Sequence, residues 1–379
     1  MTPRFFSLMP QDAWFFRDGR PYNHQESNQA DVESVFPPPA RTLTGALRAA
    51  LARANGWSGT GRWREELNCC FGAGPNDLGL LQFTSPFLIH SDATGKSKAL
   101  WPIPRYLLGD RNTQGRWTPK TFLCPSNKPT ETDQGPRCLP EIALRPGLDH
   151  DGLKLAEGSW IMTDGLAAVL AGKLPELGTI CHQNHLWKFE PRVGLARNAE
   201  TLNVGESDLY SPSYVRLRRG VALGVGVGGV PEGMAHVPDI FPLGGESRLA
   251  RCEEWGRSPV PALPSRERFT LDTESRVAFI IVLLTPGRFI AGKPTLPGAE
   301  IISACVGKPQ FIGGWDSLKR EPLPLEPFAA AGSVWFCAAT PGDFDAIHKT
   351  HGRHIGAHTA HGFGQIAIGL WPPTFTNRL

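Results

Sequence analysis

The stretch Phe36-Pro-Pro-Pro-Ala-Arg-Thr-Leu-Thr-Gly-Ala-Leu-Arg48 leads from a rigid proline corner directly into a helix. Each proline fixes φ at about −65° and disfavours helical conformation at the preceding residue, so the helix is expected to begin at about Arg41. Thr42 or Thr44 is predicted to cap the first turn, and Gly56 is predicted to stop the helix after about Ala54. One apolar face recurs at helical spacing and consists of Leu43, Leu47, Ala50, Leu51 and Ala54.

Arg41 and Arg48 lie seven positions apart in this helix, which places them about two turns apart on nearly one side. Two guanidinium groups, threonine hydroxyls and unpaired backbone N–H groups at a helix start suit a phosphate group. A capped core helix with two solvated arginines fits the same residues. The local sequence leaves both interpretations open.

The composition is that of a globular protein with many turns. The chain has 379 residues, which allows about two domains. It is 41% apolar and 20% charged, and its 42 glycines and 35 prolines indicate many loops around a packed core. The net charge of +3 permits an anionic partner without requiring one.

Neither the cysteines nor the apolar segments indicate a secreted or membrane protein. None of the eight cysteines belongs to a CxxC motif, which favours reduced thiols over a zinc site. The N-terminal segment has no signal-peptide pattern. The longest apolar run, residues 277–284, is far shorter than the ~20 residues that span a bilayer. The expected location is therefore the cytoplasm, with no membrane partner.

Two segments are rich in basic residues. Residues 91–140 have little periodicity and are predicted to form a long inserted loop. Between Lys188 and Arg219 there are six Lys or Arg against four Asp or Glu, and a strand there would place Arg216 and Arg218 on one face beside tyrosines. Such a face fits a single-stranded nucleic-acid surface. It also fits an ordinary solvated strand.

Five of the eleven histidines fall between His348 and His361. His351, His354 and His358 would share one face of a helix, but no recognised zinc pattern accompanies them, so no metal site is predicted. A general acid–base histidine for RNA cleavage has no paired base at a defined spacing. A loop that meets phosphates or bases and a plain polar loop both fit these histidines.

Enzyme motifs are absent from the sequence. There is no GxSxG, no P-loop and no ordered Cys/His signature. The glycines at 224, 226 and 228 are not followed by a helix, so they predict a strand with close backbone contacts rather than a dinucleotide site. No catalytic residue and no cofactor are predicted.

Seven short motifs, in order along the chain, resemble the third subunit of the type III-B CRISPR effector (the Cmr complex), a member of the RAMP superfamily. Each motif is weak alone, but together they extend from residue 12 to residue 371. They are Asp12–Pro21 (DAWFFRDGRP), Phe36–Arg48 (FPPPARTLTGALR), Arg192–Arg197 (RVGLAR), Phe241–Arg248 (FPLGGESR), Gly313–Trp315 (GGW), Ala331–Phe336 (AGSVWF) and His361–Trp371 (HGFGQIAIGLW).

The resemblance implies an α+β fold with two ferredoxin-like (RRM-related) domains and long insertions. The first domain would span residues 1–190, with the inserted loop at about 91–140. The second would span residues 191–379 and carry a C-terminal glycine-rich loop. The implied function is non-catalytic. The subunit holds the 5′ handle of the CRISPR RNA and contacts the large polymerase/cyclase-like subunit and a neighbouring RAMP backbone subunit. The alternative is a RAMP-type endoribonuclease that processes repeat RNA.

The resemblance also implies which residues contact RNA. The glycine loop would let the backbone approach RNA closely and donate N–H groups to it, whereas Gly244-Gly245-Glu246 is expected only to shape a turn. The implied RNA-binding residues are Arg17, Arg20, Arg41, Thr42 and Arg48 in the N-terminal blocks, Arg192 and Arg197 in the central motif, and His361, Gly362, Phe363 and Gly364 in the C-terminal loop.

Overall fold

The computed structural model describes residues 3–17, 31–32, 34–112, 116–133, 135–143, 147, 149–195, 209–272 and 274–372. The chain folds into two compact units, each made of segments that are separated in the sequence. Unit 1 comprises residues 1–97, 184–258 and 311–326, and unit 2 comprises residues 98–183, 259–310 and 327–379.

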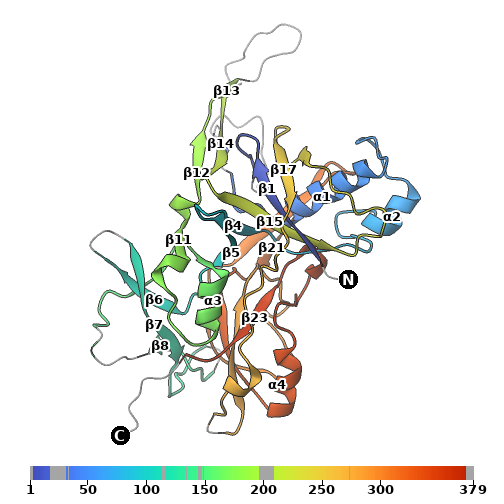
Figure 1. Ribbon diagram of the computed structural model, residues 1–379. Helices are drawn as coiled ribbons and strands as arrows, with labels where there is room; N and C mark the ends of the chain where they lie inside the picture. Colours follow the sequence, from blue (N-terminus) through green and yellow to red (C-terminus); the bar gives the residue numbers. More distant parts are fainter. Residues whose placement is uncertain are drawn as a thin grey trace. The chain divides into compact units, whose positions relative to one another are not determined.

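An antiparallel sheet forms the centre of unit 1 (Figure 1). Every residue of its β15 strand is buried, and a Cβ atom on Gly226 would lie 2.7 Å from the Phe5 ring. These glycines therefore serve close packing, as predicted. In spatial order the strands are β4 (Phe87–Ser91), β15 (Val221–Gly228), β1 (Arg4–Pro10), β17 (Leu249–Glu254) and β16 (Ile240–Pro242), with β3 (Gln82–Phe83) paired to one end of β15.

The proline corner leads into helix α1 (Ala40–Ala54), close to the predicted bounds. The predicted threonine cap is wrong. The N-cap residue is Pro39, and its carbonyl oxygen accepts the Thr42 N–H at 3.0 Å, so the backbone itself closes the first turn. On the apolar face Ala54 is exposed and Ala52 is buried instead. A short helix, α2 (Glu65–Phe71), follows.

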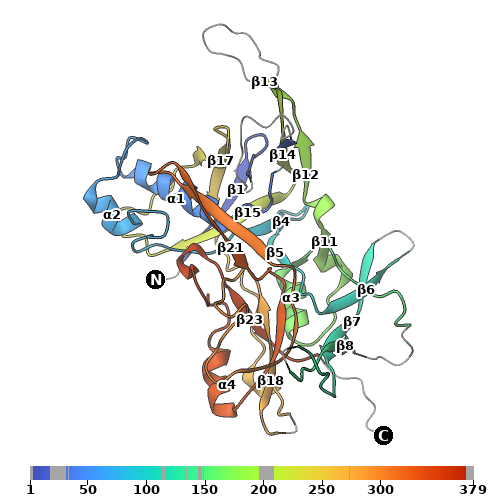
Figure 2. The same cartoon turned by 180° about the vertical axis from the view of Figure 1, so that it is seen from behind.

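Two β-structures complete unit 1. The first is a ribbon in which β14 pairs with β12 and β13 in antiparallel fashion and with β2 in parallel. Its strands are β12 (Trp187–Pro191), β13 (Gly194–Leu195), β14 (Leu209–Leu217) and β2 (Asp31–Val32). The second is the hairpin of β20 (Gln310–Asp316) and β21 (Glu321–Phe328), whose residues 311–326 run beside α1 (Figure 2).

The main sheet of unit 2 is also antiparallel. Helix α4 (Pro341–His348) covers it, and the Thr340 hydroxyl caps this helix by accepting the Asp343 N–H. The core contains Phe279, Trp335 and Phe344. In spatial order the strands are β19 (Glu300–Cys305), β22 (Val334–Ala339), β18 (Val277–Leu283) and β23 (Ile366–Gly369).

The segment predicted to be a long inserted loop, residues 91–140, contains strands. Trp117, Phe122 and Cys124 are buried on β7, so alternating apolar residues organise a segment whose Pro and Lys content suggested a loop. One sheet consists of β8 (Pro140–Ile142), β7 (Trp117–Pro125), β6 (Leu107–Arg111) and β9 (Lys154–Leu155). Beside these lie β5 (Ser97–Pro102), β10 (Ser159–Met162), helix α3 (Thr163–Leu170) and β11 (Ile180–His182).

The α+β class is confirmed by these antiparallel sheets and helices. The boundary at residue 190 does not match the two units. Strands β15 and β17, from residues 221–254, complete the sheet that β1 begins, so the predicted boundary falls within unit 1. Strand pairing between distant segments, which local sequence patterns do not report, decides this division.

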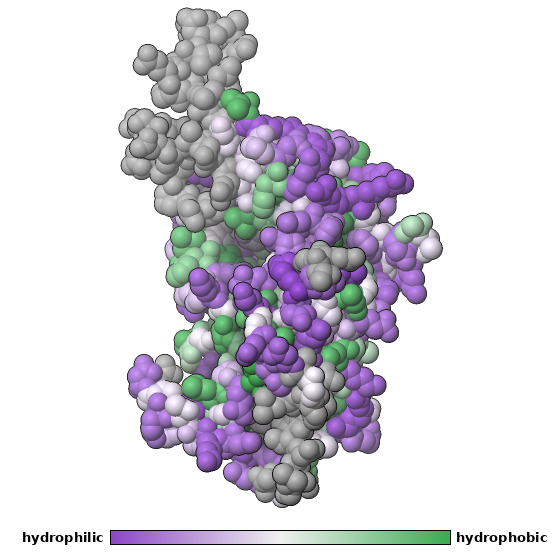
Figure 3. Space-filling model, turned by 90° about the vertical axis from the view of Figure 1, so that its left-hand side faces the viewer, coloured by the Kyte–Doolittle hydropathy of each residue, from purple (hydrophilic) through white to green (hydrophobic). Residues whose placement is uncertain are grey.

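The surface carries hydrophobic side chains in small groups among hydrophilic ones on the side shown in Figure 3. Among the described residues, no helix has both the length and the apolar character needed to cross a membrane.

Candidate nucleic-acid interface

Three of the sequence motifs meet in unit 1 at the base of the ribbon. Asp12 comes from the first motif, Arg192 from the central motif and Arg248 from the FPLGGESR motif. The Asp12 carboxylate accepts a hydrogen bond from Arg192 at 3.0 Å and lies 3.5 Å from the Arg248 guanidinium. We name this group the arginine–carboxylate cluster; it consists of Asp12, Glu190, Arg192, Tyr214, Arg216, Glu246 and Arg248.

Glu190 is the most strongly bonded carboxylate of the cluster. It accepts hydrogen bonds from Arg216 Nε at 2.5 Å and from Arg192 Nη2 at 2.8 Å. The bond from Arg216, followed by that from Arg192, lowers the pKa of Glu190 to about 2, and the same two arginines lower the pKa of Asp12. Both carboxylates are therefore ionised at neutral pH and hold the two guanidinium groups in place.

Tyr214 lies between two arginines of the cluster. The Arg248 Cζ atom is 4.4 Å from the ring centroid and the Arg192 Cζ atom is 4.8 Å from it. The Tyr214 hydroxyl donates a short hydrogen bond to Glu246. Burial, together with this carboxylate, raises the pKa of Tyr214. The cluster therefore combines charge-assisted hydrogen bonds with cation–π contacts.

The turn at Gly244-Gly245 fixes the cluster against the first motif. The Gly245 N–H donates to the Phe15 carbonyl oxygen at 2.8 Å. Gly244 has φ of 86°, and a Cβ atom there would lie 2.6 Å from the same oxygen. This confirms that the segment shapes a turn. The charged partners of the cluster were not predicted, because they lie up to 236 positions apart in the sequence.

The ribbon, which carries part of the cluster, is basic. Its described residues, 31–32, 187–195 and 209–219, contain five basic side chains and two acidic ones, Asp31 and Glu190, so their formal charge is +3. Lys188, Arg218 and Arg219 are exposed, and Phe189 is 48% exposed. Arg216 and Arg218 were predicted to lie on one face of a strand. This holds only in part, because β14 ends at Leu217 and Arg216 is bound to Glu190.

Of the predicted contacts in the N-terminal blocks, Arg17 is exposed and Thr42 is half-buried. Arg41 is different, because its side chain is buried and lies 3.3 Å from Glu326 on the β20–β21 hairpin. Burial lowers the pKa of Arg41, and Glu326 opposes that shift. Arg41 therefore joins α1 to the hairpin. Arg20 and Arg197 lie outside the described residues.

Arg48, which was predicted to contact RNA, is buried and has a structural role instead. Its guanidinium donates to the carbonyl oxygens of Phe71, Gly72, Gly74 and Asp77 at 2.8–3.0 Å. Burial lowers its pKa to about 10, so it remains a cation at neutral pH. These four bonds hold residues 71–77 in place and leave the side chain inaccessible to a phosphate.

The C-terminal loop residues that were predicted to contact RNA lie inside the unit. His361 and Phe363 are buried. The Gly362 N–H donates to the Thr359 carbonyl and the Gly364 N–H donates to the Pro286 carbonyl, so neither is available to RNA. Gly364 has φ of 74°, and a Cβ atom there would overlap the Ile355 carbonyl oxygen. The close backbone approach that these glycines permit occurs within the chain itself.

The clustered histidines do not share a helix face. Helix α4 ends at His348, and a short 3₁₀ turn, η4 (Thr359–His361), is the next helical element. Both ring nitrogens of His351 form hydrogen bonds, to the Pro261 carbonyl and from the Ile368 N–H. Burial lowers the pKa of His354 to about 4. In the described part of the chain, no three side chains of suitable type are grouped as metal ligands.

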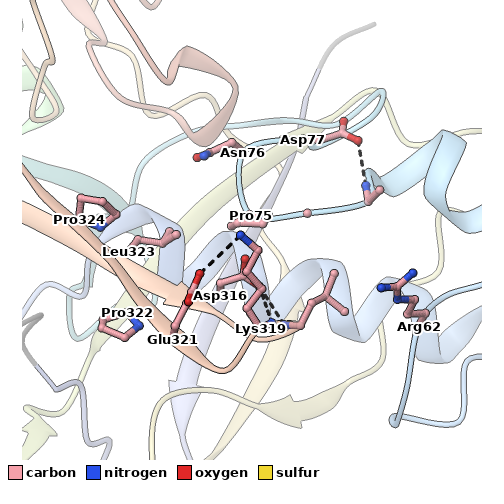
Figure 4. A pocket seen from close by; sticks show the side chains of 13 residues that line it. Arg62, Pro75, Asn76, Asp77, Asp316, Lys319, Glu321, Pro322, Leu323 and Pro324 are labelled. Carbon is pink, nitrogen blue, oxygen red and sulfur yellow. Dashed lines mark hydrogen bonds and ion pairs between the residues drawn. The ribbon is translucent and has the colours of Figure 1, made fainter.

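A groove of about 560 Å³ lies between residues 73–77 and the tip of the hairpin (Figure 4). Backbone N–H groups bind a carboxylate on each wall: Asp77 accepts from Ala73 at 2.9 Å, and Asp316 accepts from Leu318 at 2.9 Å. Pro75, Pro322 and Pro324 also line it. Arg48 holds the 71–77 segment and so fixes one wall of the groove.

Comparison with known proteins identifies one family. The family model described as "CRISPR-associated protein (Cas_Cmr3)" matches residues 6–371. No curated protein matches the chain. Among solved structures, it is similar to a chain in "Cryo-EM structure of the Type III-B Cmr-beta bound to cognate target RNA", with 15% identity, 91% of this chain and 89% of that chain covered, and a TM-score of 0.47. It is also similar to a chain in "Crystal structure of Csm1-Csm4 cassette in complex with pppApA", with 14% identity, coverage of 88% and 86%, and a TM-score of 0.37.

Proposed function

Because the chain belongs to the Cas_Cmr3 family of CRISPR-associated proteins and is a component of a type III CRISPR effector, we propose that it holds the 5′ handle of the CRISPR RNA without catalysing a reaction. In the same proposal it contacts the large polymerase/cyclase-like subunit and a neighbouring RAMP backbone subunit, and the complex works in the cytoplasm. The alternative is a RAMP-type endoribonuclease, which would need an accessible acid–base pair.

The observation that carries the RNA-binding proposal is the charge of the β12–β14 ribbon. A formal charge of +3 over these short strands attracts a polyanion and releases its counterions. Lys188, Arg218 and Arg219 are exposed on it, and the exposed ring of Phe189 provides a surface on which a base can stack. All of these side chains belong to unit 1, so the surface is complete within that unit.

The arginine–carboxylate cluster supports this proposal by fixing the ribbon. Arg192 and Arg216 are bound to Asp12, which lies just after β1, and Trp14 and Val215 exchange two backbone hydrogen bonds of 3.0 and 2.7 Å. Binding to a preformed surface avoids the entropy cost of ordering it. Most arginine charge inside the cluster is already neutralised, so the RNA contacts are assigned to the exposed residues beyond it.

The strand orders support a ferredoxin-like assignment of both units. In unit 1 the strands β1, β4, β15 and β17 lie in the order second, third, first, fourth, and in unit 2 the strands β18, β19, β22 and β23 lie in that same order. In unit 1 α1 connects the parallel strands β1 and β4, and in unit 2 α4 connects β22 and β23, each around one intervening strand. This is the split βαβ arrangement of ferredoxin-like folds.

A binding experiment tests the proposed RNA surface. The triple variant Lys188→Ala/Arg218→Ala/Arg219→Ala is compared with the wild type and with Arg251→Ala, an exposed arginine of β17 in the same unit. The triple variant should bind handle RNA at least tenfold more weakly, and its salt dependence should fall by about 0.7 for each phosphate that it no longer neutralises. Unchanged affinity of the triple variant, or an equal weakening in Arg251→Ala, would contradict the assignment.

A further inference from the structure

The β20–β21 hairpin exposes an apolar face that the proposed RNA surface does not use. Phe311 is 67% exposed and Trp315 is 57% exposed, and strand alternation places both on one face of β20, with Gly313 between them. A Cβ atom on Gly313 would lie 3.1 Å from Leu325 Cδ2, so this leucine, itself 44% exposed, fills the space between the aromatic rings. We name Phe311, Gly313, Trp315 and Leu325 the hairpin patch.

The opposite face of the hairpin is attached to unit 1. Glu326 lies 3.3 Å from the buried Arg41 guanidinium. A Cβ atom on Gly314 would lie 3.1 Å from Arg41 Cδ and 3.0 Å from Leu323 Cδ1, so the strand packs closely there. The hairpin therefore cannot turn over to bury Phe311 and Trp315 without breaking this attachment. Its exposed apolar face is a fixed feature of the unit.

Charge distinguishes the possible occupants of the hairpin patch. Residues 310–328 contain two basic side chains, Lys319 and Arg320, and three acidic ones, Asp316, Glu321 and Glu326, so their formal charge is −1. The ribbon of the same unit carries +3. A polyanion gains nothing from counterion release at the hairpin. Exposed Trp and Phe side chains are typical of the centre of a protein–protein interface.

The prolines of β21 limit how a partner can bind. Pro322, Pro324 and Pro327 have no backbone N–H, so the strand lacks donors that an added strand would need. An added strand therefore cannot pair fully along β21, and we assign the binding of the partner to the side chains of the patch. Leu318 at the hairpin tip is exposed and lines the groove of Figure 4, which gives a side chain of the partner a place to enter beside the patch.

We propose that the hairpin patch is a docking site for another protein subunit of the same effector, one that presents an apolar surface with an uncharged or basic rim. The proposal rests on the proposed function in so far as the chain works inside a multisubunit complex. The docking proposal goes beyond the proposed function because it names the surface and excludes RNA as its occupant. Trp315 is the central anchor, since it has the largest exposed apolar side chain of the patch.

The test uses the full chain co-expressed with the other effector subunits and guide RNA. The variants are Phe311→Ser/Trp315→Ser, the single change Trp315→Ser, and the control Ile290→Ser, a fully exposed apolar residue of unit 2. The amount of partner subunits that co-purify with the double variant should fall at least about tenfold, as expected for removal of an aromatic anchor. Ile290→Ser should recover them as the wild type does. Because all three side chains are exposed, the melting temperatures should be unchanged.

Handle-RNA affinity of the purified chain, measured in parallel, separates this proposal from the proposed function. The double variant should bind handle RNA within about twofold of the wild type, a difference below ~0.5 kcal/mol. Normal recovery of the partner subunits would overturn the docking site. Weakened RNA binding by the double variant would make the patch an RNA surface, and Trp315-dependent self-association of the wild type would make it a homodimer contact; both also overturn it. If the wild type fails to bind handle RNA, the proposed function fails, whatever the subunit recovery.

Discussion

Arginines of unit 1 have three different roles, although their local sequences look alike. Arg48 binds four carbonyl oxygens inside the unit. Arg192 and Arg216 are bound by carboxylates of the cluster. Arg218 and Arg219 are exposed, with no carboxylate partner among the described residues. Only the last group can give a phosphate its full charge, so accessibility, more than residue type, selects the RNA contacts.

Replacement of Arg48 should destabilise the protein without a direct effect on RNA contacts. Arg48→Met would remove four donors to carbonyl oxygens, two of them in buried bonds, and we expect a decrease of about 3 kcal/mol in the free energy of unfolding. Denaturant unfolding of the two proteins measures this decrease. Arg53→Met, at an exposed position of the same helix, is the control and should change stability little. Equal stability of wild type and Arg48→Met would contradict the structural role.

The stability contribution of Glu190 should depend on pH in a defined window. Its pKa falls from an ordinary value of 4.5 to about 2 in the folded protein, chiefly through the bond from Arg216. A lowered folded pKa stabilises the protein above pH 4.5, and this stabilisation is lost as the pH falls towards 2. The difference in unfolding free energy between wild type and Glu190→Gln should therefore shrink across that range.

Chemical denaturation at a series of pH values measures the Glu190 effect. Glu232→Gln is the control, since Glu232 is exposed and has no bonded partner in the described part of the chain. The difference in unfolding free energy between Glu232→Gln and the wild type should be small and should not change with pH. A difference for Glu190→Gln that is the same at pH 2.5 and pH 7 would show that its bonds do not stabilise the charged form.

At the scale of elements, glycine has different structural roles in α1 and in the C-terminal loop. Gly45 lies within α1, and a Cβ atom there would contact nothing within 4 Å. Gly364 follows the η4 turn in a left-handed conformation, directly against the Ile355 carbonyl oxygen. Both glycines belong to motifs that suggested RNA contacts, but only Gly364 is required by the backbone.

Alanine at these two glycines should therefore change stability in opposite directions. Gly45→Ala should stabilise the protein by about 0.5–1 kcal/mol, because alanine loses less conformational entropy in a helix. Gly364→Ala should destabilise it by about 3 kcal/mol or more, since strain from positive φ adds to a clash with backbone. Thermal unfolding of both variants provides the measurement. Stabilisation by Gly364→Ala would show that the loop is built differently.

At the scale of the whole molecule, three histidines of the 348–361 segment bear on the endoribonuclease alternative. His361 is buried, His351 has both ring nitrogens engaged, and burial lowers the pKa of His354 to about 4. A general acid–base pair must reach the substrate and exchange protons near neutral pH. None of these three rings meets both conditions.

The purified chain should therefore bind repeat-derived RNA without cutting it. The measurement is gel analysis of end-labelled repeat RNA after incubation in EDTA, with a metal-independent ribonuclease as the positive control. His361→Ala should behave as the wild type does. Cleavage by the wild type that His361→Ala abolishes would support the endoribonuclease alternative and would contradict the non-catalytic proposal.

The sequence by itself determined the family, the α+β class and some of the local elements. Prolines 37–39 restrict the backbone, and the apolar positions after them form one helical face, so α1 lies close to its predicted bounds. The Gly244-Gly245 turn followed from the same kind of local restriction. Ordered motifs from residue 12 to residue 371 identified the family, because each motif is a short contiguous stretch that needs no tertiary information.

Only the tertiary structure decided which residues are free to act. Arg41 is bound by a glutamate 285 positions away, and Arg48 by a loop that starts 23 positions away. Strands β15 and β17 complete a sheet begun at residue 4, so the unit boundary does not follow chain order. Burial, ion pairing and strand pairing join residues that are distant in the sequence, and their energies depend on that proximity. Local patterns therefore identified the motifs, whereas packing separated structural arginines from exposed ones.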